Sequence, residues 1–260
     1  MSSRHPKRRV IIAAAILGVG LSGFFDGILL HQVLQWHHLL SLVPGATFRN
    51  METQILADGL FHVLMYVVVA TGLWLLWRTR PVLASDDGSW RTVGGGALLG
   101  FGIWNVVDVA FFHWVLGIHR IRINVPDPMA YDLGWLALFG LAPLALGWLL
   151  LRRTGHDGRG GGAAAAAALG LLALVAAPIA SLPIRGTNTA LVIFAPGTRP
   201  AVAFNAAIAA EAPILWIEPH GRMMAVALPN SSAPSRLYRA GALLVTRSPA
   251  LAGCAAATTA

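Results

Sequence analysis

Cysteine and charged residues are scarce in this sequence, and both shortages narrow what the protein can be. The single cysteine, Cys254, excludes an internal disulfide and a zinc site built from cysteines. Only 12% of the 260 residues are charged and 56% are hydrophobic, which is too apolar for an ordinary soluble domain. The net charge of +8 comes from short arginine clusters between hydrophobic runs, not from one basic face, and does not indicate nucleic-acid binding. The composition predicts a protein whose main partner is the lipid bilayer.

The hydrophobic residues form five runs, each long enough to cross a bilayer, which takes about 20 helical residues. The expected spans cover residues 10–34, 55–77, 93–117, 133–151 and an alanine-rich run that ends near residue 182. The tail that follows has the pattern strand, helix, strand, strand, helix, strand, which is typical of a ferredoxin-like domain. The sequence thus predicts an all-α polytopic membrane bundle with a small α+β domain after it. The expected parts are a four-helix membrane core (1–153), a linker with the fifth transmembrane helix (154–183) and an extracytoplasmic domain (184–260).

The basic residues predict the orientation of these spans. The N-terminus and the loops after spans two and four carry ten Lys and Arg residues, whereas the two opposite short loops carry three. The positive-inside rule therefore places the N-terminus in the cytoplasm and the tail in the periplasm, with the chain in a bacterial inner membrane.

The first and third spans repeat one pattern of ionisable residues. In each, an aspartate is followed by histidines five and eleven positions later. The two sets are Asp26, His31 and His37, and Asp108, His113 and His119. Ionisable side chains at membrane depth are costly and rare, which makes them functional candidates. We interpret spans one and three as an internal repeat. Positions eleven apart nearly coincide on a helix, so Asp26 is expected to lie above His37 on one helix face.

A further Asp/His pair, Asp58 and His62, lies in the second span at the depth of the repeated pairs. Imidazole and carboxylate together suit zinc, copper or iron. An aspartate can bind the ion directly or accept a hydrogen bond that orients a histidine ring. The candidate metal ligands are His31, His62, His113, Asp26, Asp58, Asp108, His37, His119 and Glu52.

Two other interpretations need no metal ion. His37, His38 and His119 can be helix-end residues bonded to lipid headgroups or water. The Asp and His side chains can also form a structural network that fastens the helices. The glycines shared by the repeat, Gly18, Gly20, Gly100 and Gly102, are expected to allow close helix approach.

The string FDGILLHQVLQWHH resembles a bacterial family of membrane proteins without an assigned function, domain-of-unknown-function family twenty-two forty-three. The ADGLFH segment and the D-x4-H of the third span add to the likeness, which covers about residues 10–153. The resemblance implies a polytopic membrane protein and supplies no activity or ligand.

These observations favour an inner-membrane protein that binds a transition metal at the periplasmic side of the bundle. Its role would be metal handling or delivery to a respiratory enzyme, with a respiratory or metal-trafficking protein as partner. One alternative is an intramembrane metal-dependent hydrolase or oxidoreductase, in which the metal activates water or oxygen. Another is a b-type haem carrier with His31 and His113 as ligands.

Overall fold

The structure is a computed structural model that describes residues 4–49, 51–84, 90–152, 161–180, 188–195, 197–218 and 221–247. The chain divides into two compact units, Met1–Ala177 and Pro178–Ala260, and each is described by itself. The first unit is helical and the second contains a four-stranded antiparallel sheet.

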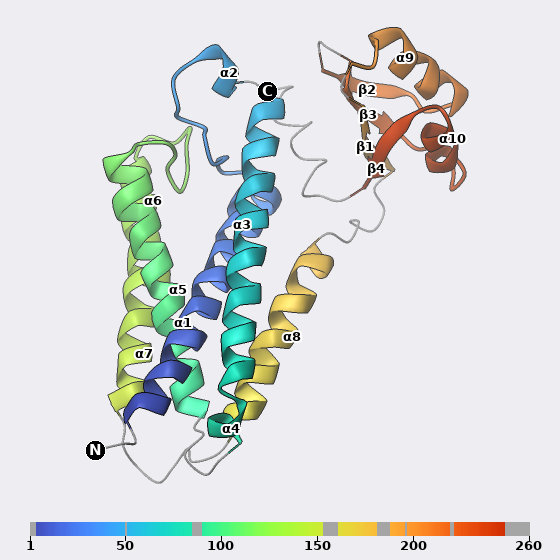
Figure 1. Ribbon diagram of the computed structural model, residues 1–260. Helices are drawn as coiled ribbons and strands as arrows, with labels where there is room; N and C mark the ends of the chain where they lie inside the picture. Colours follow the sequence, from blue (N-terminus) through green and yellow to red (C-terminus); the bar gives the residue numbers. More distant parts are fainter. Residues whose placement is uncertain are drawn as a thin grey trace. The chain divides into compact units, whose positions relative to one another are not determined.

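The first unit contains four helices that are long and apolar enough to cross a membrane, within the described residues. Each membrane-length helix except α3 includes a π-helical segment, labelled η, in which the backbone is wider than in an α-helix. Figure 1 shows these helices side by side. The elements are α1 (Arg4–Asp26) with η1 (Gly27–Val33), α2 (Ala46–Arg49), α3 (Met51–Arg78), α4 (Arg80–Leu83), α5 (Trp90–Val107) with η2 (Asp108–Val115), and α6 (Pro128–Trp135) with η3 (Leu136–Leu141) and α7 (Ala142–Arg152).

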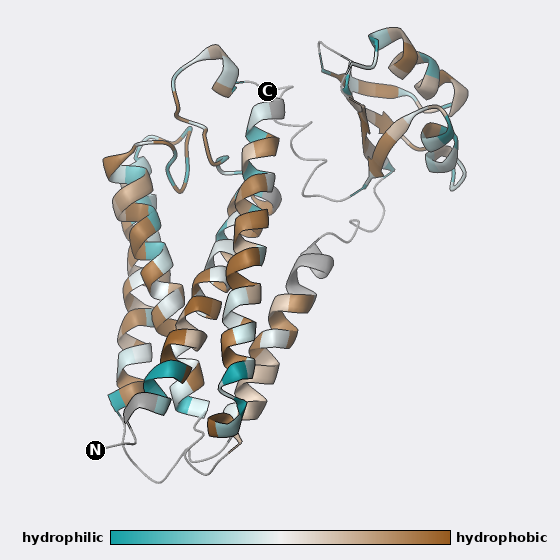
Figure 2. Cartoon of the chain, viewed as in Figure 1, coloured by the Kyte–Doolittle hydropathy of each residue, from teal (hydrophilic) through white to brown (hydrophobic). Residues whose placement is uncertain are grey.

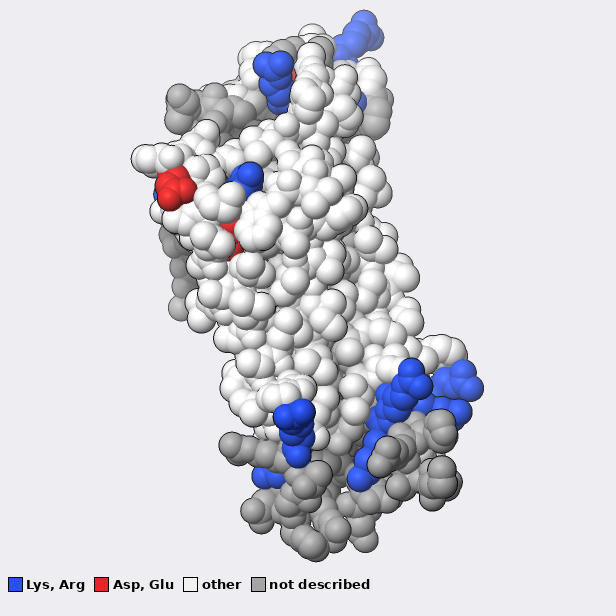
Figure 3. All heavy atoms as spheres, turned by 90° about the vertical axis from the view of Figure 1, so that its left-hand side faces the viewer, with Lys and Arg blue, Asp and Glu red and all other residues white. Residues whose placement is uncertain are grey.

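The outer surface of this unit is apolar between its two ends. Leu60, Val67, Trp77 and Leu138 each have about 60% of their surface exposed, and Figure 2 shows brown, hydrophobic residues along the helices. Figure 3 shows a broad belt without described Lys, Arg, Asp or Glu atoms, with Lys and Arg gathered at the end where α4 lies. A surface of this kind is unstable in water and matches the hydrocarbon core of a bilayer.

Helices α1 and α5 approach each other closely because two glycines face the partner backbone. A Cβ atom on Gly18 would lie 2.0 Å from the carbonyl oxygen of Ala97, and one on Gly100 would lie 1.9 Å from that of Ala15. Any side chain at either position would push the helices apart. The expectation that these glycines serve close helix approach is confirmed. Helix α1 also packs on α3, and α5 on α7.

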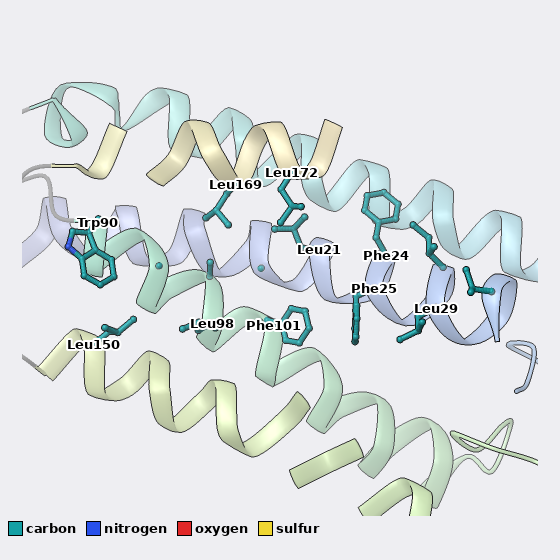
Figure 4. Close-up of a pocket in the computed structure, with 15 residues that line it drawn as sticks. Leu21, Phe24, Phe25, Leu29, Trp90, Leu98, Phe101, Leu150, Leu169 and Leu172 are labelled. Atoms are coloured by element: carbon teal, nitrogen blue, oxygen red, sulfur yellow. The ribbon is translucent and has the colours of Figure 1, made fainter. Parts of the chain in front are cut away.

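The fifth predicted span falls on α8 (Gly162–Ala180), an apolar helix of 19 residues. Its Leu169 and Leu172 lie over an apolar groove of about 600 Å³ along α1 and α5, as Figure 4 shows. Ala173 belongs to the same buried cluster as Leu17 and Val69. Helix α8 therefore packs on the bundle, and its role as a fifth span stays a prediction.

The second unit has the element order that the sequence predicts. The sheet is antiparallel with strand order β2-β3-β1-β4, and its buried core includes Val192, Phe194, Met224 and Leu237. Both helices carry residues of that core, Ala203 on the first and Leu237 on the second. The elements are β1 (Thr189–Phe194), α9 (Pro200–Ala209), β2 (Ile214–Ile217), β3 (Met223–Ala227), α10 (Ala233–Arg239) and β4 (Ala242–Thr246).

Candidate metal centre

The π-helical segments η1 and η2 carry the first histidine of each repeated motif, His31 and His113. Short π-helical stretches inside α-helices are rare and occur often at functional sites. Neither helix continues to the second histidine. Each ends at a valine, and two residues later the backbone enters the left-handed region, at Gln35 (φ 51°) and at Gly117 (φ 63°). The chain then reverses at the helix end, as it does after many helices.

This reversal differs from the continuous helix expected from the sequence, yet it still brings both histidines to their aspartate. Two groups of donor atoms result, in each of which one atom per residue lies within 4.8 Å of the others. We call Asp26, His31 and His37 the first triad, and Asp108, His113 and His119 the second triad. All six residues are buried, with at most 3% of their surface exposed. The two histidine rings of each triad have centroids 4.6 Å apart and planes inclined at 71°.

All four histidines turn their Nδ1 atom to an oxygen acceptor. In the first triad, His31 Nδ1 lies 3.1 Å from Asp58 Oδ1, and His37 Nδ1 donates to the carbonyl oxygen of Ile121 at 3.0 Å.

The second triad repeats these contacts with partners at the corresponding places. His113 Nδ1 donates to Asp132 Oδ1 at 3.0 Å, and His119 Nδ1 donates to the carbonyl oxygen of Leu39 at 3.0 Å. A proton held on Nδ1 leaves the Nε2 of a neutral imidazole with a free lone pair.

The Nε2 atoms lie close to one another or to a carboxylate. His31 Nε2 lies 3.0 Å from His37 Nε2. In the second triad, Asp108 Oδ2 lies 3.0 Å from His113 Nε2, and Asp108 Oδ1 lies 3.3 Å from His119 Nε2. Asp26 Oδ1, His31 Nδ1, Asp108 Oδ2 and His113 Nε2 are buried and have no hydrogen-bond partner. A proton on one atom of each close pair, or a metal ion between the atoms, would satisfy them.

Asp58 and Asp132 support the triads from neighbouring helices. Asp58 Oδ1 accepts from Leu39 N at 2.9 Å, and its Oδ2 lies 2.7 Å from His38 Nδ1. Asp132 Oδ1 accepts from Ile121 N at 3.0 Å, and its Oδ2 accepts from Arg120 Nη1 at 2.7 Å. An acceptor of this kind fixes the tautomer and raises the basicity of a metal-binding histidine.

The other predicted ligands have different surroundings. His62 Nδ1 donates to the carbonyl oxygen of Asp58 at 2.8 Å, and its ring stacks on Phe24. The structure brings His62 into neither triad. The side chain of Glu52 lies outside the described part of the chain. His37 lies beyond the first span, and its burial beside His31 and His119 holds its pKa well below the ordinary value. A neutral imidazole is the form that binds a metal ion.

Two features of the site were not found from the sequence. Asp132 is fully buried within the fourth membrane-length helix and also accepts from Trp114 Nε1 at 3.1 Å. Asp132 directly precedes the fourth span expected from the sequence (133–151), and its position in the membrane-length helix became clear from the structure. Asn105 links the helices as well, since it donates to Ser22 Oγ at 2.7 Å and accepts from Trp135 Nε1 at 2.7 Å.

Four apolar membrane-length helices around buried Asp and His side chains define a multi-pass membrane protein. Residues 13–154 match the model of the family described as "Predicted membrane protein (DUF2243)", and the chain belongs to this family. The resemblance seen in the sequence is thereby confirmed. No curated protein and no solved structure matches the chain.

Proposed function

We propose that this membrane protein binds a transition metal through its two Asp/His triads, with zinc, copper and iron as the candidate ions. The observation that carries the proposal is the orientation of the four imidazoles. Three of the four Nδ1 atoms are hydrogen-bonded to an oxygen, and His31 Nδ1 lies 3.1 Å from Asp58 Oδ1, an arrangement that leaves each Nε2 of a neutral ring to offer a lone pair inside a buried site. Metal-binding histidines typically have this arrangement, in which the second ring nitrogen donates to a carboxylate or a backbone carbonyl.

The site is buried, which favours a metal ion that is held by the protein over a metal ion that a substrate can reach. Catalytic metal sites keep a coordination position open to water or substrate. Here the six triad residues are at most 3% exposed, which favours metal handling over hydrolysis. A respiratory or metal-trafficking partner protein stays a prediction from this class of site.

The metal proposal is tested by the metal content of the purified full-length protein. Wild type, expressed with added zinc, copper or iron, should carry metal that plasma mass spectrometry detects above a mock preparation. The double variant His31→Ala/His113→Ala removes one ligand from each triad and should lose most of that metal. Thermal melting of both proteins checks that the variant is folded. Wild type without metal under every supplement would leave the structural Asp–His network as the better account.

The paired contacts support the further proposal that spans one and three are an internal repeat. Leu39 and Ile121 each follow the second histidine of their motif by two residues. Both carbonyls accept from the opposite half, and both N–H groups donate to an aspartate of the following helix. Such exchange of equivalent contacts is what duplicated helices packed around a two-fold axis produce.

The basic residues support an orientation with the N-terminus in the cytoplasm and the C-terminal unit in the periplasm of a bacterial inner membrane. With α8 as a fifth span, a periplasm-active reporter fused after Ala260 should be active. The same reporter fused after Arg153 should be inactive. The reverse pattern of activities would contradict the orientation.

A further inference from the structure

We infer that the centre holds two metal ions, one in each triad, as an adjacent pair. This inference rests on the proposed metal binding and adds to it the number and the position of the ions. Three observations carry it: the planes of the histidine rings, the unmet acceptors of each triad, and the number of buried carboxylates.

The ring planes separate the two ions. An imidazole binds a metal through a lone pair that lies in the plane of its ring. His37 and His119, the second histidines of the two triads, are stacked with centroids 4.8 Å apart and planes only 10° apart. Stacked rings direct their in-plane lone pairs along separate, nearly parallel planes. The stacking of these two histidines therefore favours a separate ion for each of them over one shared ion.

Within each triad the opposite holds. The planes of His31 and His37 are inclined at 71°, and so are those of His113 and His119. Steeply inclined planes intersect along a line, on which one ion can meet both lone pairs. The donor atoms of each triad lie within 4.8 Å of one another, so that small side-chain shifts would bring them to one ion with bonds of about 2.0–2.2 Å. Each triad thus offers two histidines and one carboxylate, a set that binds divalent iron in many proteins.

Each triad also has a place for a positive species of its own. Asp26 Oδ1 in the first triad and Asp108 Oδ2 in the second are buried carboxylate oxygens without a hydrogen-bond partner. In the first triad, His31 Nε2 lies 3.0 Å from His37 Nε2; in the second, His113 Nε2 and His119 Nε2 lie 3.0 and 3.3 Å from the oxygens of Asp108. An ion in one triad would not serve the carboxylate of the other.

The buried charges can support two cations side by side. Asp26, Asp58, Asp108 and Asp132 are each at most 6% exposed, and a group of unbalanced carboxylates at this depth is costly. Two divalent ions bring as many positive charges as these four carboxylates bring negative ones. Arg120 adds one more on a side chain that is 27% exposed and therefore partly hydrated. Paired metal ions in proteins typically lie about 3.5–4 Å apart and share such acidic surroundings.

The hydrogen bonds that orient the histidines connect the two triads. His37 of the first triad donates to the carbonyl of Ile121, whose N–H donates to Asp132, the partner of His113 in the second triad. His119 is tied to Leu39 and Asp58 in the same way. Neither half of the chain therefore builds its triad alone.

The test is the number of Zn²⁺ ions per chain. Full-length protein is stripped with a chelator, dialysed against excess Zn²⁺ and analysed by plasma mass spectrometry, with thermal melting as the folding control. Wild type should bind two ions. His31→Ala and His113→Ala should each bind one, and the double variant none. His62→Ala changes a half-buried histidine outside both triads, and this variant should still bind two ions. Asp26→Asn and Asp108→Asn serve as milder replacements if an alanine variant does not fold.

Each other result has a distinct meaning. One ion in wild type and none in either single variant would overturn the pair but leave the proposed metal binding intact. No ion in wild type would overturn the proposed function itself. Loss of an ion from His62→Ala would overturn the assignment of the ligands. Loading with Mn²⁺ then tests adjacency, since paired ions should give an exchange-coupled paramagnetic resonance spectrum and a spectrum of isolated ions would contradict the pair.

Discussion

Gly100→Ala should strongly destabilise the membrane unit, even though the change adds one methyl group and improves helix propensity. The new Cβ would lie 1.9 Å from the carbonyl oxygen of Ala15, which belongs to a backbone and cannot rotate away. Helices α1 and α5 would have to separate. We expect a loss at or above the upper end of the roughly 1–3 kcal/mol that overpacking costs. Thermal melting of the detergent-solubilised protein measures it.

Gly94 in the same helix is the matched control. A Cβ at this position would meet only the Trp90 side chain, at 3.9 Å, which is ordinary contact. Gly94→Ala should therefore be neutral or stabilising by up to about 1 kcal/mol, the gain in helix propensity. Gly18→Ala should resemble Gly100→Ala, because its Cβ would lie 2.0 Å from the carbonyl oxygen of Ala97. Equal melting temperatures for the Gly94 and Gly100 variants would show that the two helices do not depend on this contact.

The membrane-length helices, the contact between α1 and α5 and the order of elements in the tail could be predicted from the sequence. The apolar runs predict the four membrane-length helices, because a bilayer requires about 20 apolar residues and little else matches that pattern. The repeated glycines predict the close contact, because only glycine admits such an approach. The alternation of strands and helices in the tail predicts its element order.

The geometry of the triads was less accessible from the sequence. The spacing D-x4-H-x5-H predicts which residues come together. The prediction that each motif lies on one continuous helix was wrong. The chain reverses at Gln35 and Gly117, and a left-handed residue such as Gln35 has no reliable sequence signal. The Leu39 and Ile121 carbonyls accept hydrogen bonds from distant segments of the chain. Because every residue has a backbone carbonyl, the residue type does not indicate which carbonyls have this role.

Asp132→Ala should damage both the stability of the bundle and the second triad. The carboxylate is fully buried and accepts from His113 Nδ1, Ile121 N and Arg120 Nη1, so its removal leaves several donors without an acceptor. Breaking one side of a buried charged pair costs about 3–5 kcal/mol. Losing the acceptor of a metal-binding histidine typically lowers metal affinity by about 10–100-fold.

Asp127 provides the control, because it lies at the start of the same helix and is bonded only locally. Its Oδ1 accepts from Ala130 N as an N-cap, so Asp127→Ala should cost about 1 kcal/mol and leave metal binding unchanged. Asp132→Asn keeps an oxygen acceptor without the charge. Its melting temperature and its affinity for Zn²⁺ should therefore lie between those of the two alanine variants. Thermal melting and Zn²⁺ titration across the three proteins separate the effects on folding and on binding. Equal Zn²⁺ affinity of Asp132→Ala and Asp127→Ala would show that His113 does not need its carboxylate partner. The ligand role assigned to His113 through its oriented Nε2 would then have to be abandoned.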